Sequence, residues 1–355
     1  MGTPVTKIDN STTVRELMRP LEPILAPDSV TEIAINQPGE VWAMTNGEWV
    51  RHFIPMLTRQ KLESLANAIA VFNGLALAPK LSLVMPDGQR AEVTLPPACV
   101  DDQLGLNIRK HAQRSFSLEE LDTAGVFSRV ADASFNKPDD AAIAALMDVA
   151  DMTRLDDREA ELLRLKADGR WREFLAAAVR YKRNIIVAGK TGSGKTTFAR
   201  SLVGKIPTNE RILTIEDVHE MILDGHPNKF HLLYNPSGSG QGRITAFSAL
   251  MSCMRQSPDR ILLAELRGNE AWEYVNSLNT GHPGSITTTH ANSATHTYER
   301  TAMLVKNSDA GRDLGIEIIR QVLYTTLEVV VYMENRRVVE VFYDPLFSKK
   351  SKLAA

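Results

Sequence analysis

Hydrophobic and polar positions follow two different patterns along this chain of 355 residues. In the first 130 residues, short runs rich in β-branched and aromatic residues are separated by Pro-Gly and Asn-Gly turns, which favours antiparallel strands. The segment 58–72 differs, because its apolar residues recur at helical spacing. The expected strands are 31–36, 40–45, 49–53, 81–85, 90–95 and 104–110. Residues 1–130 are therefore predicted to be a smaller α+β N-terminal domain.

In the second half of the chain, apolar runs alternate with amphipathic segments, which is typical of a mostly parallel sheet covered by helices. The expected strands are 185–188, 211–216, 260–264 and 285–289, with helices at 197–205, 245–255 and 269–278 and a closing hairpin at 327–333 and 337–342. This pattern predicts an α/β domain over residues 166–345. We expect a linker with helices over 131–165 and a mobile basic tail over 346–355.

One loop between a predicted strand and a predicted helix carries a chemical signature. It has two glycines with four residues between them, followed by Lys195 and Thr196, and this spacing is typical of a loop whose backbone N–H groups hold phosphates. Lys195 is suited to neutralising the β- and γ-phosphates, and Thr196 is suited to binding Mg²⁺. The expected nucleotide-binding residues are Gly189, Lys190, Thr191, Gly192, Ser193, Gly194, Lys195, Thr196 and Thr197.

Polar side chains end three other predicted strands. Glu216, Glu265 and His290 each end or follow a predicted strand, and ligands of open α/β sheets bind beyond the carboxyl ends of the strands. One carboxylate is expected to hold the outer shell of Mg²⁺ and the other to orient the attacking water, and the sequence leaves open which does which. The expected metal ligands are Thr196 and Glu265. His290 either senses the γ-phosphate or makes a structural hydrogen bond.

Composition narrows the function classes only slightly. The formal net charge of −2 gives no overall basic field, which argues against nucleic acid as the main partner. The two cysteines, Cys99 and Cys253, are far apart in the sequence, so a reducing compartment is the simplest interpretation. No apolar run approaches the roughly 20 residues that span a bilayer. We expect a cytoplasmic protein whose membrane contact, if any, is peripheral.

Four segments together resemble the secretion, or traffic, ATPases, the hexameric motors of type IV secretion, type II secretion and type IV pili. They are the phosphate loop GKTGSGKT (189–196), the acidic box TIEDVHE (214–220), the box RILLAELRG (260–268) and the histidine box TGHPGSITTTHANSA (280–294). The type IV secretion branch is most similar. The segments 96–99 and 108–110 resemble it, and two lone cysteines exclude the four-cysteine zinc insertion that is common in type II secretion members.

The resemblance implies a RecA-like C-terminal ATPase domain that uses ATP and Mg²⁺, six copies in a ring, and nucleotide held between the two domains. It gives catalytic roles to Lys195, Glu216, Glu265 and His290, and it makes Arg90 and Arg109 candidates for phosphate contact from the N-terminal domain. Implied partners are inner-membrane channel components and a coupling ATPase, with peripheral attachment at the inner membrane and no sequence-specific nucleic-acid binding.

Three alternatives remain open from the sequence. The chain could bind ATP as an assembly switch with little turnover, although carboxylates and a histidine near the loop favour hydrolysis. It could serve type II secretion or a type IV pilus. A nucleic-acid translocase is a further alternative, and the near-neutral charge without interleaved aromatic and basic residues argues against it.

Overall fold

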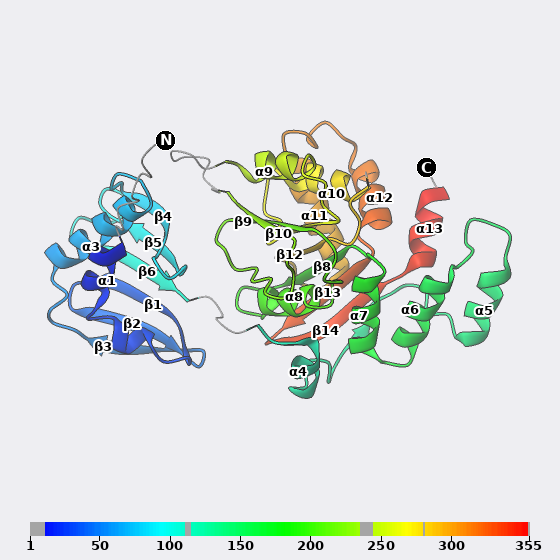
Figure 1. Cartoon of the computed structure of the whole chain (residues 1–355), viewed down its shortest axis with the longest axis horizontal. Coiled ribbons are helices and arrows are strands. Elements are labelled where there is room, and N and C mark those ends of the chain that lie inside the picture. Colours follow the sequence, from blue (N-terminus) through cyan, green and yellow to red (C-terminus); the bar gives the residue numbers. More distant parts are fainter. Residues whose placement is uncertain (1–10, 111–114, 235–243, 280, 354–355) are drawn as a thin grey trace, which may run out of the picture. The chain divides into compact units, whose positions relative to one another are not determined.

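The computed structural model describes residues 11–110, 115–234, 244–279 and 281–353 (Figure 1). The chain divides into two compact units at about residue 113, and we describe each unit by itself. The boundary predicted from the sequence lies near residue 130, so the predicted and observed boundaries differ by the segment that contains helix α4 (Leu118–Thr123). Leu118 and Val126 are buried in the core of the second unit, and this burial places the segment there.

The first unit is an antiparallel sheet with helices packed on it. Its strand order is β3-β2-β1-β6-β5-β4. Helix α3 begins where Thr58 accepts a hydrogen bond from the Lys61 N–H, and its Leu62 and Ile69 share one core with Ile33 of the sheet. The elements are α1 (Ser11–Met18), α2 (Glu22–Leu25), β1 (Val30–Gln37), β2 (Glu40–Thr45), β3 (Glu48–Phe53), α3 (Arg59–Phe72), β4 (Lys80–Val84), β5 (Arg90–Thr94) and β6 (Gly105–Arg109). The expected antiparallel sheet and long helix are both present.

The second unit is built on two sets of mostly parallel strands, β10-β9-β11 and β12-β8-β13-β14-β7. The sets meet at β11 and β12, where the Leu266 N–H donates to the Thr288 carbonyl at 2.8 Å. Among the described strands of this unit, only β13 and β14 pair antiparallel, as the predicted hairpin requires. The strands are β7 (Ala131–Asp132), β8 (Ile185–Gly189), β9 (Ile212–Glu216), β10 (Lys229–Leu233), β11 (Arg260–Leu263), β12 (Ile286–Thr289), β13 (Val329–Glu334) and β14 (Arg337–Tyr343).

Side chains of the central strands point alternately to the two faces of the sheet, and each face carries its own apolar core. On β8, Ile185 and Val187 belong to one core, and Ile186 and Ala188 belong to the other, because successive strand residues face opposite sides. Helices α5 (Asp140–Asp148), α6 (Asp157–Ala167), α7 (Trp171–Arg180) and α8 (Lys195–Val203) contribute to the first core, and α9 (Ala246–Cys253), α10 (Ala271–Asn279), α11 (Ala294–Asn307) and α12 (Ile316–Thr326) to the second. The strands therefore lie between two helical layers.

The predicted linker and the predicted tail are both packed against the second unit. Ile143 and Leu155 of the linker are buried in its first core, and β7 pairs with β14. The tail forms α13 (Pro345–Leu353), where Leu346 is buried and Lys349 Nζ lies 2.7 Å from Glu159 Oε2. The expectation of a mobile tail is wrong for residues 346–353, since packing and an ion pair hold them. Residues 354–355 lie outside the described part of the chain.

The buried Arg260 on β11 predicts a large stability loss on substitution. Its side chain is fully buried, its Nε donates to Glu210 at 2.6 Å, and its guanidinium also reaches the Gly284 carbonyl. We expect Arg260→Leu to lower the free energy of unfolding by about 3–5 kcal/mol, because it removes the closest ion-pair partner of the nearly buried Glu210 and leaves that carboxylate with the longer contact to Lys182. In urea denaturation, Arg312→Leu, which removes the exposed pair with Asp309, should cost less than about 1 kcal/mol. Equal losses in the two variants would contradict the prediction.

Candidate active site

The phosphate loop joins β8 to α8, as the sequence predicts. Gly189, Gly192 and Gly194 have φ values of +152°, +76° and +94°, a region that favours glycine. A Cβ on Gly189 would lie 2.4 Å from the Met333 carbonyl oxygen, so the loop passes directly against β13. Gly194 is the N-cap of α8, which turns the first N–H groups of that helix toward the loop.

Two features of the loop fit a phosphate ligand. The Ser193 hydroxyl is buried and has no hydrogen-bond partner within the described part of the chain, although buried hydroxyls are normally paired. The Lys195 ammonium is buried and donates to the carbonyls of Gly189 at 2.7 Å and Lys190 at 2.9 Å. Thr196 and Thr197 follow in the first turn of α8 and are partly exposed. An anion in the loop would give the serine and the lysine stronger partners than they have here.

The structure brings Lys195, His290 and Glu265 together. Lys195 Nζ lies 3.4 Å from His290 Nδ1, and His290 Nε2 lies 3.1 Å from Glu265 Oε1. Glu265 Oε2 accepts a hydrogen bond from Arg267 at 2.7 Å, and Arg267 also reaches Asp217 at 2.8 Å. These residues follow β8, β9, β11 and β12, so the ends of four strands meet in one chain of polar contacts. Of the three strand-end side chains predicted to converge on the loop, Glu265 and His290 contact each other and Lys195, and Glu216 makes other contacts.

The charges along this chain of contacts are set by burial and by neighbouring groups. Burial and the Lys195 charge lower the pKa of His290, which favours the neutral ring at pH 7. Burial alone would raise the pKa of Glu265, but the hydrogen bond and charge of Arg267, with His290 and Lys195, hold it below the usual value. Glu265 is therefore ionised. A neutral His290 that donates from Nε2 to Glu265 presents Nδ1 as an acceptor toward Lys195.

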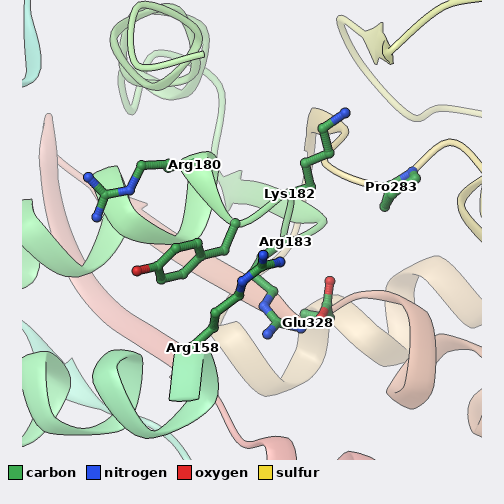
Figure 2. Close-up of a pocket in the computed structure, with 7 residues that line it drawn as sticks. Arg158, Arg180, Lys182, Arg183, Pro283 and Glu328 are labelled. Carbon is green, nitrogen blue, oxygen red and sulfur yellow. Dashed lines mark hydrogen bonds and ion pairs between the residues drawn. The ribbon is translucent and has the colours of Figure 1, made fainter. Parts of the chain in front are cut away.

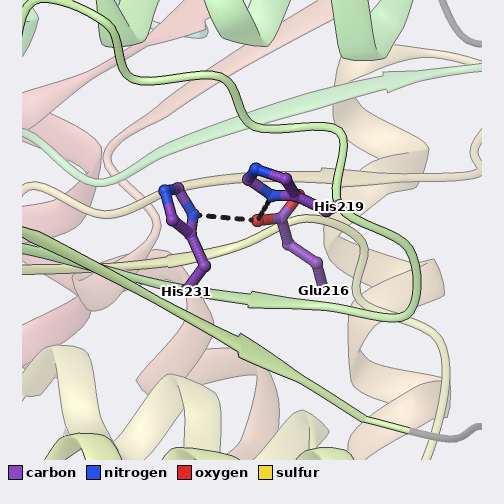
Figure 3. Close-up of side chains that lie close together, drawn as sticks. All are labelled: Glu216, His219 and His231. Atoms are coloured by element: carbon purple, nitrogen blue, oxygen red, sulfur yellow. Dashed lines mark hydrogen bonds and ion pairs between the residues drawn. The ribbon is translucent and has the colours of Figure 1, made fainter. Parts of the chain in front are cut away.

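Glu216 has a different environment from Glu265. Its carboxylate is fully buried, and one oxygen accepts hydrogen bonds from the N–H groups of Glu220 and Met221 at 2.6 Å. The other oxygen faces His219 and His231 at 3.3 Å each (Figure 3). Burial alone would raise the pKa of Glu216, but these hydrogen bonds hold it far below the usual range. The contacts of this carboxylate are thus with its own loop and β10, not with Lys195 or His290.

Arg90 and Arg109, the arginines proposed to contact phosphate, belong to the first unit. They lie directly opposite each other on β5 and β6, so their side chains share one face of that sheet. Arg109 is exposed and Arg90 is half-buried. The structure therefore places the two arginines side by side, and their contact with nucleotide stays a prediction.

A pocket of about 500 Å³ opens beside the phosphate loop. Its lining includes Lys190 and Thr191 of the loop, His290, and two residues of α11, His296 and Arg300. Helix α11 was not predicted from the sequence. Arg267 had no predicted role, although it stands inside the RILLAELRG box. The i, i+4 spacing of His296 and Arg300 is the signal that could have placed both on one helix face. Thr280, the first residue of the histidine box, lies outside the described residues.

A second pocket, of about 580 Å³, lies at the opposite ends of the strands (Figure 2). Lys182 and Arg183 precede β8, Pro283 precedes β12, and Glu328 precedes β13, whereas the phosphate loop follows β8. Arg183 is paired with Glu328 at 2.6 Å. This pocket is therefore separate from the phosphate loop and takes no part in the contacts that reach Lys195.

A glycine phosphate loop at the end of a buried parallel strand, with a Lys–His–Glu chain beside it, defines the class of the protein as a nucleoside-triphosphate-hydrolysing α/β protein. Residues 154–337 match the family described as type II/IV secretion system protein. The chain belongs to that family, and it is an ATPase. The resemblance to the secretion ATPases drawn from the sequence is confirmed.

The relatives belong to the type IV secretion branch. The chain is 39% identical to the type IV secretion system protein VirB11 of Brucella suis, covering 92% of this chain and 89% of that protein. It is 37% identical to VirB11 of Bartonella quintana, with 96% of each chain covered, and 35% identical to PtlH of Bordetella pertussis, covering 94% of this chain and 96% of PtlH.

Solved structures agree with this assignment. The chain superposes on the VirB11 ATPase of Brucella suis, which was crystallised with sulphate, with a TM-score of 0.54, 38% identity and 98% of both chains covered. The pilus retraction motor PilT with bound ADP has a TM-score of 0.57 at 18% identity, covering 95% of this chain and 87% of PilT, and supports the fold alone. Within the described residues, none of the helices has the length and apolar character needed to cross a membrane.

Proposed function

We propose that this chain is the ATP-hydrolysing motor of a type IV secretion system and that its second unit is a RecA-like ATPase domain. The observation that carries the proposal is the contact chain Lys195–His290–Glu265 beside the phosphate loop. A loop that only bound nucleotide would not need an ionised carboxylate and a neutral histidine beside its lysine. The names of the relatives supply the secretion context.

Each side chain near the phosphate loop has a separate role in the proposed hydrolysis of ATP. Loop N–H groups and the Ser193 hydroxyl bind the phosphates of ATP, and Lys195 exchanges its two carbonyl partners for phosphate oxygens. Thr196 would hold Mg²⁺ directly and Glu265 would hold it through water, and the ion would neutralise phosphate charge. Glu265 orients the attacking water and accepts its proton, while His290 positions Glu265.

Glu216 becomes a positioning residue in this proposal. Its carboxylate is saturated by the backbone of the loop that follows β9, so it fixes the conformation of its neighbour Asp217. Asp217 in turn holds Arg267 at 2.8 Å, and Arg267 holds Glu265. Of the two carboxylates that the sequence left open, Glu265 takes the catalytic role.

We further propose that six copies assemble into a ring in which Arg90 and Arg109 reach a phosphate. The ring would lie at the cytoplasmic face of the inner membrane, attached peripherally through channel components and a coupling ATPase. Two opposed arginines on adjacent strands are suited to a polyphosphate. ATP-driven changes in the ring would then move substrate or pilus subunits.

The proposal predicts phosphate release and a defined assembly. With ATP and Mg²⁺, the purified chain is expected to release phosphate steadily and to sediment as a hexamer, and removal of Mg²⁺ should abolish release. In a host whose own copy is deleted, the chain should restore transfer of the secreted substrate. Binding of ATP without measurable turnover, with the channel components present, would favour the switch alternative and overturn the motor.

A further inference from the structure

A cluster of three potential metal ligands lies outside the contacts that reach the phosphate loop. Its members are Glu216 at the end of β9, His219 in the following loop and His231 on β10 (Figure 3). One ligand atom from each residue lies within 4.8 Å of the others. Figure 3 shows both imidazole rings turned toward the same carboxylate, with dashed lines meeting on one oxygen. The rings are 4.4 Å apart between centroids.

The separation of each histidine nitrogen from the carboxylate matches tetrahedral coordination. Zinc binds imidazole nitrogen and carboxylate oxygen at about 2.0–2.1 Å, so two ligands at a tetrahedral angle lie about 3.3–3.4 Å apart. Nδ1 of His219 and Nδ1 of His231 each lie 3.3 Å from Glu216 Oε1. This separation is longer than a good hydrogen bond, so an ion could bridge each pair once His231 Nδ1 gives up its 2.8 Å contact with the Thr214 hydroxyl.

The carboxylate is already fixed as a metal ligand requires. Glu216 is fully buried, and its other oxygen is held by two backbone N–H groups at 2.6 Å. Thr214 donates to Oε1 at 2.7 Å. Such outer partners orient a ligand and retain it in the binding geometry. His231 is held on a strand whose register with β9 places it opposite Thr214, so two of the three ligands are preorganised.

His219, the third ligand, is the member of the cluster that faces solvent. The His219 side chain is 48% exposed, against 22% for His231 and none for Glu216. An ion could therefore enter past His219 and complete its coordination with water, as three-ligand zinc sites do. Imidazole ligands favour zinc and similar transition metals over Mg²⁺, which prefers oxygen. The ion of this cluster would thus differ from the one used with ATP.

We propose that Glu216, His219 and His231 form a binding site for Zn²⁺ or a similar divalent transition metal. The ion ties the loop after β9 to β10 and so stabilises the segment that carries Asp217. Because Asp217 contacts Arg267, which contacts Glu265, the site lies one residue away from the active-site contact chain. This inference stands independently of the proposed secretion role.

Cobalt binding to the full-length chain tests the site directly. After dialysis against a chelator, titration with Co²⁺ is expected to give the intense visible absorption of four-coordinate cobalt at one ion per chain, and Zn²⁺ should displace it. His219→Gln and His231→Gln should each weaken Zn²⁺ binding by more than about tenfold, since loss of outer partners alone costs that much. His52→Gln, in the first unit, is the matched control and should bind as the wild type does.

A second measurement separates loss of binding from loss of fold. Zn²⁺ should raise the Tm of the wild type, because a ligand that binds only the folded state stabilises it, and the rise should be absent in His219→Gln. That variant changes a half-exposed side chain, so its Tm without metal should be close to the wild-type value. Zinc binding that neither histidine variant weakens, or cobalt spectra of six-coordinate ions only, would overturn the proposal.

Discussion

Replacing Lys195 with glutamine is expected to reduce ATP hydrolysis by about a hundred- to a thousandfold, the effect of removing one preorganised charge from a transition state. Lys195 is the buried lysine of the phosphate loop, and its ammonium donates hydrogen bonds to the carbonyls of Gly189 and Lys190. Glutamine can replace one of those hydrogen bonds but not the positive charge. Steady-state phosphate release measures the loss.

The control for this variant is Lys205→Gln. Lys205 follows the same helix, and its ammonium pairs with Glu119 rather than with the loop. It should leave phosphate release near the wild-type rate. Circular dichroism of both variants should match the wild type, because glutamine fits the space of the lysine and can keep one of its hydrogen bonds to the loop carbonyls. If Lys195→Gln hydrolysed ATP at the normal rate, the assignment of the loop as the catalytic site would be wrong.

The site residues that could be predicted from the sequence are those that follow the carboxyl ends of buried strands. Lys195 and Glu265 follow apolar runs, and His290 follows the β-branched run Ile286–Thr289. All three runs are buried, and parallel strands bring their carboxyl ends to one edge. Such runs are readable because they are short, uninterrupted and bounded by polar residues. The convergence of Glu265 and His290 on the loop could therefore be predicted from the pattern, whereas Glu216, which was expected to join them, contacts its own loop and β10.

Other parts depended on packing that a single sequence does not reveal. Strand β10 was missed because it lies at the edge of its sheet, with Phe230 and Leu233 exposed and His231 partly buried. Without β10, nothing placed His231 beside Glu216, so Glu216 and Glu265 looked equivalent. The linker also lacks a compositional signal, since burial of Ile143 becomes evident only when α5 lies on α6.

Glu265→Gln is expected to lower ATP hydrolysis by about a hundred- to ten-thousandfold, the usual contribution of a general base. The substitution keeps an oxygen that can accept from Arg267 or His290, so the side chain should stay in place. It removes the negative charge that orients water and helps to hold Mg²⁺. Nucleotide binding should persist, because the loop N–H groups and Lys195 are intact, and a fluorescent nucleotide titration checks this.

Glu216→Gln is the comparison that decides between the two carboxylates. Glutamine at position 216 puts an amide NH₂ where a carboxylate oxygen now accepts hydrogen bonds from backbone N–H groups, so its main cost should appear as a lower Tm. Its phosphate release should fall less than that of Glu265→Gln, since Glu216 acts on Glu265 only through Asp217 and Arg267. A larger loss of turnover in Glu216→Gln than in Glu265→Gln, with an unchanged Tm, would show that Glu216 and not Glu265 is the catalytic base. The catalytic base would then be the residue that closes onto the loop only when nucleotide is bound.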